Sequence, residues 1–208
     1  IANTQAEQAQ LLWLYNADRR KILVCPPGVN TNRFHPVPAE QACAAVNLPD
    51  DEQMLLFVGR IEPLKAVDSI LDALHLLRQQ QPSILQSVRF TIVGGDPKDT
   101  TDLDMMALRR QARQLGLSDI EYFAGAKDQD TLVSYYAAAT TVIVPSEYEA
   151  FGMVALEAMA TGTPVIASEV GGLAYLVQDG ETGYLVTSRS PEKLANRIER
   201  MLTPPARR

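Results

Sequence analysis

The sequence "MLLFVGRIEPLKAVDSILDALHLL", residues Met54–Leu77, runs from an apolar segment of strand length through a short loop into a segment of helix length. In its second half, apolar side chains recur at the spacing of one helix face, at Val67, Ile70, Leu71, Leu74 and Leu77. A strand that is apolar throughout is typical of a parallel sheet buried on both faces, and parallel strands are joined by crossovers. The stretch therefore predicts the first strand–helix unit of an α/β domain.

The same alternation continues along the chain. Between stretches of helix length lie further apolar segments of strand length, at residues 88–94, 119–125, 141–145, 164–168 and 183–187. With right-handed crossovers, these segments predict a doubly wound, Rossmann-like parallel sheet. Such sheets bind ligands outside the carboxyl ends of their strands, at the point where the strand order reverses. We therefore expect the functional residues in the segments that follow the strands.

Composition and charge limit the kind of protein. With 208 residues, 46% of them hydrophobic, the chain is long enough for one substantial core. Its net charge of -6 argues against a general nucleic-acid binder, which needs a basic field. No apolar run approaches the roughly 18 residues of a membrane span, and no secretory leader opens the chain. We expect a soluble, cytoplasmic protein with no nucleic-acid partner.

Cysteine and histidine are few and scattered. Cys25 and Cys43 have no metal-ligand spacing, and His35 and His75 are the two histidines that could supply imidazole ligands. These numbers make a disulfide framework or a zinc site improbable. We expect no bound metal.

The first part of the chain differs from the rest. "IANTQAEQAQLL" is typical of a strand end that runs into a helix, with Thr4 as the N-cap and Glu7 three residues later. Residues 21–38 are rich in proline and asparagine and predict a connecting loop. We therefore expect a connecting segment at residues 1–49 and a main domain at residues 50–208. We also expect this chain to be a piece of a longer protein.

The loop after the first expected strand contains Gly59, Arg60 and Lys65. A planar guanidinium and a mobile ammonium together suit a diphosphate. Taken alone, these cations also fit the simpler interpretation of two solvated surface charges.

The loops after the second and third strands are less specific. Gly94 and Gly95 allow a tight turn and a close approach of the backbone to a ligand, although a plain turn explains them equally well. The backbone of Ala126 and Lys127 is expected to face the same crevice, where main-chain groups could read a nucleobase.

The segment after the fourth strand places Glu149 before a helix that starts near Gly152, and Glu157 inside that helix. The start of the helix attracts anions through its free N–H groups and dipole. An ionised Glu149 would repel a phosphate but accepts hydrogen bonds from hydroxyl groups such as those of a sugar, and Glu157 would reach a second set, most simply a ribose. The alternative is that Glu149 favours the helix dipole and that Glu157 is an ordinary solvated residue.

Together, these motifs are more specific than any one alone. Gly59–Arg60 followed by Lys65, then "FAGA", the two glutamates around Phe151–Gly152, "GTPVIAS" and "VGG" resemble the carboxy-terminal, donor-binding domain of retaining glycosyltransferases of the GT-B fold, in particular glycosyltransferase family 4. The resemblance covers nearly the whole chain. "GRIEPLKA" is most similar to members that use UDP-sugars, such as mycothiol-pathway N-acetylglucosaminyltransferases and sucrose-phosphate synthases, and the opening segment is similar to the crossing between the two domains of such enzymes.

The resemblance implies roles for individual residues. Arg60 and Lys65 would grip the donor diphosphate, Glu149 would meet the transferred sugar, and Glu157 would bind the ribose. The remaining donor contacts would come from the nucleotide pocket and from backbone N–H groups at the helix start, namely Gly94, Ala126, Phe151, Gly152, Met153 and Val154. No cofactor or metal is implied, and we interpret the "DLD" of Asp102–Asp104 as the capped start of a helix rather than a metal motif.

The resemblance also implies what this chain lacks. Family members carry an amino-terminal domain that binds the acceptor, so we expect half of a hexosyltransferase, inactive alone, with any peripheral membrane association confined to the missing half. A nucleotide-sugar-binding module without transfer activity and half of a UDP-sugar epimerase are the alternatives. The acceptor, the sugar, the group that deprotonates the acceptor, the oligomeric state and the choice between UDP and GDP stay open.

Overall fold

A computed structural model of the protein describes residues 1–203. Its centre is a parallel sheet in the order β3-β2-β1-β4-β5-β6. All six expected strands are confirmed, as β1 (Gln53–Val58), β2 (Val88–Val93), β3 (Glu121–Phe123), β4 (Ala139–Val144), β5 (Val165–Ser168) and β6 (Gly183–Val186). The strand order reverses between β1 and β4, which places the switch point of the doubly wound fold there.

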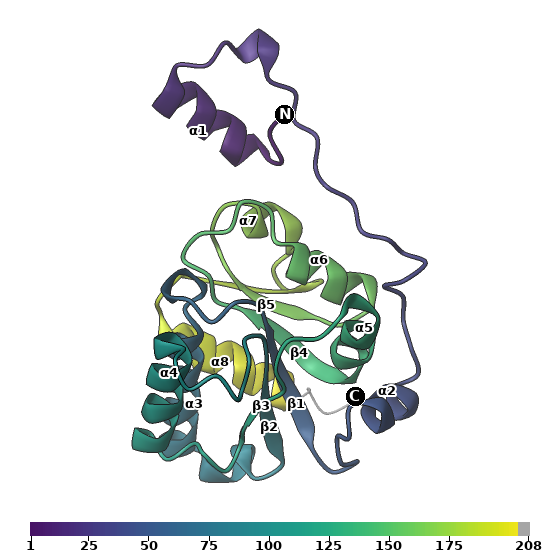
Figure 1. The fold of residues 1–208 in the computed structure, drawn as a ribbon, viewed down its shortest axis with the longest axis vertical. Coiled ribbons are helices and arrows are strands. Elements are labelled where there is room, and N and C mark those ends of the chain that lie inside the picture. Colours follow the sequence, from purple (N-terminus) through teal and green to yellow (C-terminus); the bar gives the residue numbers. More distant parts are fainter. Residues whose placement is uncertain (204–208) are drawn as a thin grey trace.

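Helices cover both faces of the sheet (Figure 1). One face packs against α3 (Val67–Gln80), α4 (Leu103–Gln114) and α8 (Pro191–Leu202). The other packs against α2 (Ala39–Ala45), α5 (Gln129–Ala138), α6 (Met153–Ala160) and the short α7 (Leu173–Leu176). Successive strand residues supply opposite cores, as Leu55 and Phe57 do for the first and Met54 and Leu56 for the second. This is why the strands are apolar throughout.

Local predictions around the first two crossover helices are confirmed. The apolar face of α3 is buried at all five expected positions: Val67, Ile70, Leu71, Leu74 and Leu77. Asp102 is the N-cap of α4, and its side chain accepts a hydrogen bond from Met105 N at 3.0 Å. The "DLD" segment therefore starts a helix, as its sequence predicts.

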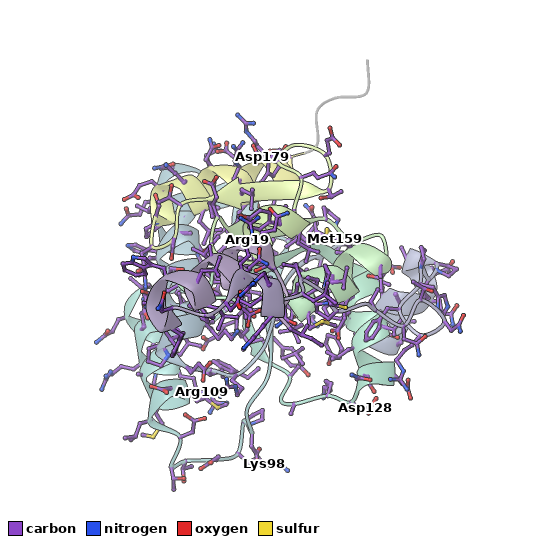
Figure 2. All side chains as sticks on the ribbon, turned by 90° about the horizontal axis from the view of Figure 1, so that it is seen from above. Arg19, Lys98, Arg109, Asp128, Met159 and Asp179 are labelled. Carbon is purple, nitrogen blue, oxygen red and sulfur yellow. The ribbon has the colours of Figure 1, made fainter. Side chains whose placement is uncertain are left out.

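The first residues form a separate segment. α1 (Gln5–Tyr15) is capped by Thr4, whose Oγ1 accepts from Glu7 N at 3.1 Å, and Ala2 bridges Val24. None of the α1 residues is buried, and Trp13 is 84% exposed. In Figure 1, this segment stands apart from the sheet, beyond the end where α6 and α7 lie, and a long trace connects it to α2. Seen from above in Figure 2, the first segment with Arg19 is drawn over the middle of the main domain.

The connecting segment is fastened to the main domain before residue 49. Phe34 is buried, with its ring centroid 6.1 Å from that of Tyr136 on α5, and Arg33 forms an ion pair with Asp130 at 2.8 Å. Leu48, just after α2, is buried in the same core as α5. The boundary near residue 49 stays a prediction, and the packing shows which earlier residues contact the domain. Between residues 1 and 203, no helix has the length and apolar character that crossing a membrane requires.

Candidate functional site

Two of the predicted ligand residues meet where the strand order reverses. Lys65 closes a 3-10 turn, η2 (Pro63–Lys65), after β1, and Glu149 lies in the loop after the neighbouring β4. Lys65 Nζ donates to Glu149 Oε2 at 2.7 Å, and the two side chains are 23% and 20% exposed. An ammonium and a carboxylate thus face each other at the position where doubly wound sheets bind ligands.

The loop that carries Lys65 is shaped by its own sequence. Pro63 restricts φ at the start of η2, and Ala66 has a left-handed φ of 50° that turns the chain into α3. Glu147 N donates to Leu64 O at 2.9 Å, so the β1 and β4 loops are joined through their backbones. Main-chain and side-chain bonds together therefore hold Lys65 beside Glu149.

Arg189, in the loop after β6, fastens the same two loops. Its Nε donates to Glu147 Oε1 at 2.7 Å, its second terminal nitrogen donates to Pro63 O at 3.2 Å, and it pairs with Asp68 of α3. Partial burial acts to lower the pKa of Arg189, but hydrogen bonds to Glu147 and Asp68 outweigh it and raise the pKa. Arg189 was not among the residues predicted from the sequence. Its place directly after an expected strand, at the same edge of the sheet, is the feature that could have indicated it.

The start of α6 has the form that the sequence predicts. Gly152 is its N-cap with a φ of 105°, and among the described residues no side chain caps it. The positive φ favours glycine, and a Cβ at this position would lie 2.5 Å from Leu173 Cδ2, so the leucine side chain would have to shift. Because the first N–H groups of a helix lack intrahelical partners, those of Met153 and Val154 give this end of α6 an affinity for anions.

The "VGG" segment packs against the loop that carries Glu149. Gly172 N donates to Glu149 O at 3.0 Å, and a Cβ at Gly171 would lie 1.9 Å from that oxygen. A Cβ at Gly172 would similarly overlap the backbone of Phe151. These two glycines therefore let the β5 loop fix the backbone on both sides of Gly152.

Phe151 also lines a cavity between the main domain and the first segment. The cavity has a volume of about 430 Å³ and a mostly apolar lining that includes Leu156, Tyr175 and, from the first segment, Asn3 and Pro26. The predicted donor loop thus faces the crossing segment on one side and the sheet on the other.

Glu157 has a different environment from Glu149. It is half-buried on the second turn of α6, and its Oε2 accepts a hydrogen bond from the hydroxyl of Tyr136 at 2.8 Å. Burial raises the pKa of Glu157, and the Tyr136 hydrogen bond opposes that rise. The structure therefore contradicts the interpretation of Glu157 as an ordinary solvated helix residue.

The glycines after β1 and β2 bring these strand ends together. A Cβ at Gly94 would lie 1.9 Å from Gly59 O, and Gly59 N donates to Val93 O at 2.9 Å. Ala126 N donates to Gly95 O at 2.9 Å, which joins the third strand end to the second. Backbone packing alone thus explains Gly94, and the nucleotide contacts expected at these positions stay predictions.

Two other predicted donor-binding residues, Arg60 and Lys127, have side chains that contact groups other than the Lys65–Glu149 pair. The Arg60 side chain is 81% exposed and pairs with Glu62 at 3.0 Å. Lys127 is exposed, with its Nζ 6.0 Å from the ring centroid of Tyr135. The expected cationic pair of Arg60 and Lys65 is therefore not assembled in this structure.

A further polar side chain at this edge was missed. Ser146, directly after Pro145 at the end of β4, is 0% exposed, and its Oγ has no hydrogen-bond partner among the described residues. Its hydrophilic residue type gave no sign of burial. In the same part of the chain, residues 1–203, no three His, Cys, Asp or Glu side chains gather as metal ligands would.

Comparison with known proteins decides the family. The model of the family described as "Glycosyl transferases group 1" matches residues 39–208 of this chain. The chain belongs to this family. The D-inositol 3-phosphate glycosyltransferase of Acidothermus cellulolyticus is 43% identical over 204 residues, which make up 98% of this chain and 45% of that protein. A second one, from Catenulispora acidiphila, is 42% identical over 207 residues, 100% of this chain and 48% of that protein. This group 1 chain spans about half the length of the curated relatives it matches.

Solved structures confirm the GT-B fold of this group 1 domain. The sucrose-phosphate synthase of Thermosynechococcus elongatus matches with a TM-score of 0.82 and 37% identity, over 97% of this chain and 48% of that one. Anabaena HepE, solved in complex with UDP and glucose, matches with a TM-score of 0.83 and 27% identity, over 98% and 53%. The carboxy-terminal domain of LpcC from Francisella tularensis, solved by itself, matches with a TM-score of 0.70 and 28% identity, over 84% and 88%. The resemblance stated from the sequence is confirmed at the level of this family and fold.

Proposed function

We propose that this chain is the donor-binding half of a retaining family 4 glycosyltransferase. Its donor is a UDP-sugar, and the hexosyl group passes to an acceptor held by an amino-terminal domain of the full-length protein. The observation that carries the proposal is the Lys65–Glu149 pair at the switch point, beside the anion-attracting start of α6. HepE, a structural relative, is described in complex with UDP and glucose, which supports the choice of nucleotide.

The chemistry assigned to these residues is charge stabilisation. As the bond between sugar and diphosphate loosens, negative charge grows on the diphosphate, and the Lys65 ammonium, the Arg60 guanidinium and the start of α6 would stabilise it. Arg60 must leave its exposed contact with Glu62 to do so. Glu149 positions the sugar, and the acceptor attacks on the face that the diphosphate leaves, which gives retention. The site needs no metal in this mechanism.

The ion pair gives donor binding two separable parts. Without a ligand, Lys65 and Glu149 satisfy each other. In the proposed complex, the ammonium turns from the carboxylate to the charged diphosphate, whereas the carboxylate exchanges the ammonium for the neutral hydroxyls of the sugar. Glu157 accepts from the ribose, which is common to UDP and to the intact donor.

A binding module without transfer activity is the second candidate. It is favoured for the isolated chain because the chain covers about half of each relative. The curated relatives are D-inositol 3-phosphate glycosyltransferases, and one structural relative is a sucrose-phosphate synthase, which gives no support to half of an epimerase.

The proposal is tested by a thermal-shift screen of this chain with UDP, UDP-glucose, GDP and GDP-mannose. A ligand that binds only the folded state at 100 times its Kd stabilises it by about 2.7 kcal/mol, so the melting temperature rises. We expect the uridine nucleotides to stabilise the chain more than the guanosine ones. No shift with any of the four would refute donor binding. Transfer of radiolabelled sugar after the upstream sequence is restored separates the enzyme from the binding module.

A further inference from the structure

Tyr136 makes a contact that the proposed mechanism does not use. This residue is 0% exposed in the core between α5 and the sheet, yet its hydroxyl reaches Glu157 on α6 at 2.8 Å. A phenylalanine would bury the same ring without bringing a polar atom into the core, where an unsatisfied hydroxyl is costly. The contact with Glu157 is therefore the feature that distinguishes tyrosine from phenylalanine at this position.

The ring and backbone of Tyr136 are anchored on two further sides. Its carbonyl oxygen accepts from Thr163 Oγ1 at 2.7 Å, and Thr161 Oγ1 donates to Ala158 O at 2.7 Å, where α6 ends. The two threonine hydroxyl oxygens are 3.2 Å apart. With Phe34 packed against the ring, Tyr136 joins α5, the end of α6 and the connecting segment in one buried network.

A tyrosine hydroxyl has one proton to donate. Here the hydroxyl donates its hydrogen bond to Glu157 Oε2. That oxygen is held in place, while Oε1 keeps its lone pairs for other donors. The partner is neutral, and so the carboxylate retains its negative charge. Fixing a flexible glutamate before a ligand arrives reduces the entropy lost on binding.

We propose that Tyr136 is a positioning residue for the nucleotide site, whose hydroxyl holds Glu157 so that the free carboxylate oxygen accepts hydrogen bonds from the ribose. This inference rests on the proposed function, because it takes the assignment of Glu157 to the ribose from there. It goes beyond it by naming the group that fixes the carboxylate.

The contact also affects how binding depends on pH. Burial raises the pKa of Glu157, and the hydrogen bond from Tyr136 lowers it. The elements packed against α6 contribute few other ionisable groups, namely Asp130 and Tyr135 on α5 and Tyr175 on α7, with none on β4 or β5. A carboxylate accepts most strongly when ionised, so affinity is full above its pKa and falls as the pH drops through it. Loss of the Tyr136 hydroxyl should raise that pKa and move the fall in affinity to higher pH.

The test is calorimetric titration of this chain with UDP-glucose across pH, in Tyr136→Phe, Glu157→Gln and the double variant. UDP-glucose has no terminal phosphate monoester whose own ionisation would obscure the profile. Tyr135→Phe is the matched control, because it removes a neighbouring α5 hydroxyl and keeps a buried ring. We expect Tyr136→Phe to weaken binding about 3- to 10-fold and to shift the pH midpoint upward, and Tyr135→Phe to do neither. Thermal melts confirm that each variant is folded.

The outcomes distinguish this inference from the proposed function. If Glu157→Gln weakens binding but Tyr136→Phe changes neither affinity nor midpoint, the positioning role is refuted and the ribose assignment stands. If Glu157→Gln has no effect, the ribose assignment fails, and the positioning role fails with it. In the double variant, the added Tyr136→Phe change should have a smaller effect than in the parent chain, because the amide of Gln carries no charge for the hydroxyl to stabilise. A full, independent loss there would show that Tyr136 acts only through packing.

Discussion

Lys65 and Glu149 are fixed by charge, whereas Glu157 is fixed by a neutral hydroxyl, and the two carboxylates lie within one loop–helix segment of the fold. At the ion-pair end (Lys65 and Glu149), each charge already has a partner, so a ligand must replace existing bonds. At the hydroxyl end (Tyr136 and Glu157), the carboxylate is held but not neutralised. Similar glutamates can therefore be prepared for different ligand groups by the charge of the residue that holds them.

The loops around the two ends differ in the same way. The ion-pair end depends on contacts between loops, through Arg189, the Leu64–Glu147 backbone bond and the close approach of Gly171 to Glu149. The hydroxyl end depends on helices α5 and α6 packed in the core. Changes in the loops should therefore disturb the first end and leave the second in place.

Gly171→Ala should have the largest effect, because its Cβ would lie 1.9 Å from Glu149 O at a backbone with a φ of 45°. We expect the free energy of unfolding to fall by about 3 kcal/mol, measured by urea denaturation. Gly180→Ala is the control, since Gly180 also has a positive φ of 82° but an added Cβ would have nothing within 4 Å. There the loss should be about 1 kcal/mol, from backbone strain alone. Equal losses would show that the contact with the Glu149 loop does not matter.

Lys65→Ala should weaken UDP binding by about 1.5 to 3 kcal/mol, the value of a charge-assisted hydrogen bond to the diphosphate. Calorimetry measures it, with Lys193→Ala as the control, because Lys193 on α8 bonds Thr187 instead. Arg60→Ala should cost less, since the Arg60 side chain is 81% exposed. Unchanged UDP affinity in Lys65→Ala would return Lys65 to the status of a structural cation.

Substitutions of the two glutamates should affect the affinities for UDP and for the intact donor differently. Glu157→Ala should weaken UDP and UDP-glucose alike, by about 0.5 to 3 kcal/mol, because both contain the ribose. Glu149→Ala should spare UDP, since it removes the competing partner of Lys65 rather than a nucleotide contact, and should weaken UDP-glucose only. In the full-length enzyme, it should also lower the transfer rate. Parallel titrations that gave the same pattern for both variants would refute the contrast between the two ends.

Chelation should have no effect at either end. We expect the affinity for UDP-glucose to be the same with EDTA as without it, because both ends bind through side chains and backbone groups of the protein itself. The measurement is a titration before and after EDTA treatment and gel filtration. An affinity that fell with EDTA and returned with Mg²⁺ would overturn the metal-independent mechanism.

Much of this architecture could be predicted from sequence because it depends on local patterns. Strands that are apolar throughout and the apolar face of α3 are read directly from residue spacing, and Thr4 and Asp102 cap helices through residues three positions away. That Lys65 and Glu149 lie at the same edge of the sheet follows from the rule that functional loops gather there, but their ion pair was not predicted.

The features that could not be predicted from the sequence depend on contacts between residues that are distant along the chain. Arg189 lies 42 positions from Glu147, and Tyr136 lies 21 from Glu157, so no local pattern joins them. The sequence left open whether Arg60 is a solvated surface charge, and it did not predict the pairing with Glu62, which is decided by side-chain rotamers in a loop. The burial of Ser146 runs against its residue type and comes from its place at the end of a central strand.

The attachment of Phe34 to Tyr136 sets a geometric limit on rearrangement of the first segment. Val29 packs on the second core, Asn30 O accepts from Phe34 N at 2.9 Å, and Phe34 is buried, so rotation of residues 1–27 about the main domain must be absorbed before Val29. The first segment therefore joins the main domain next to Phe34, which packs against the tyrosine that holds Glu157. Movement of the first segment and a change in nucleotide affinity would therefore both involve Tyr136.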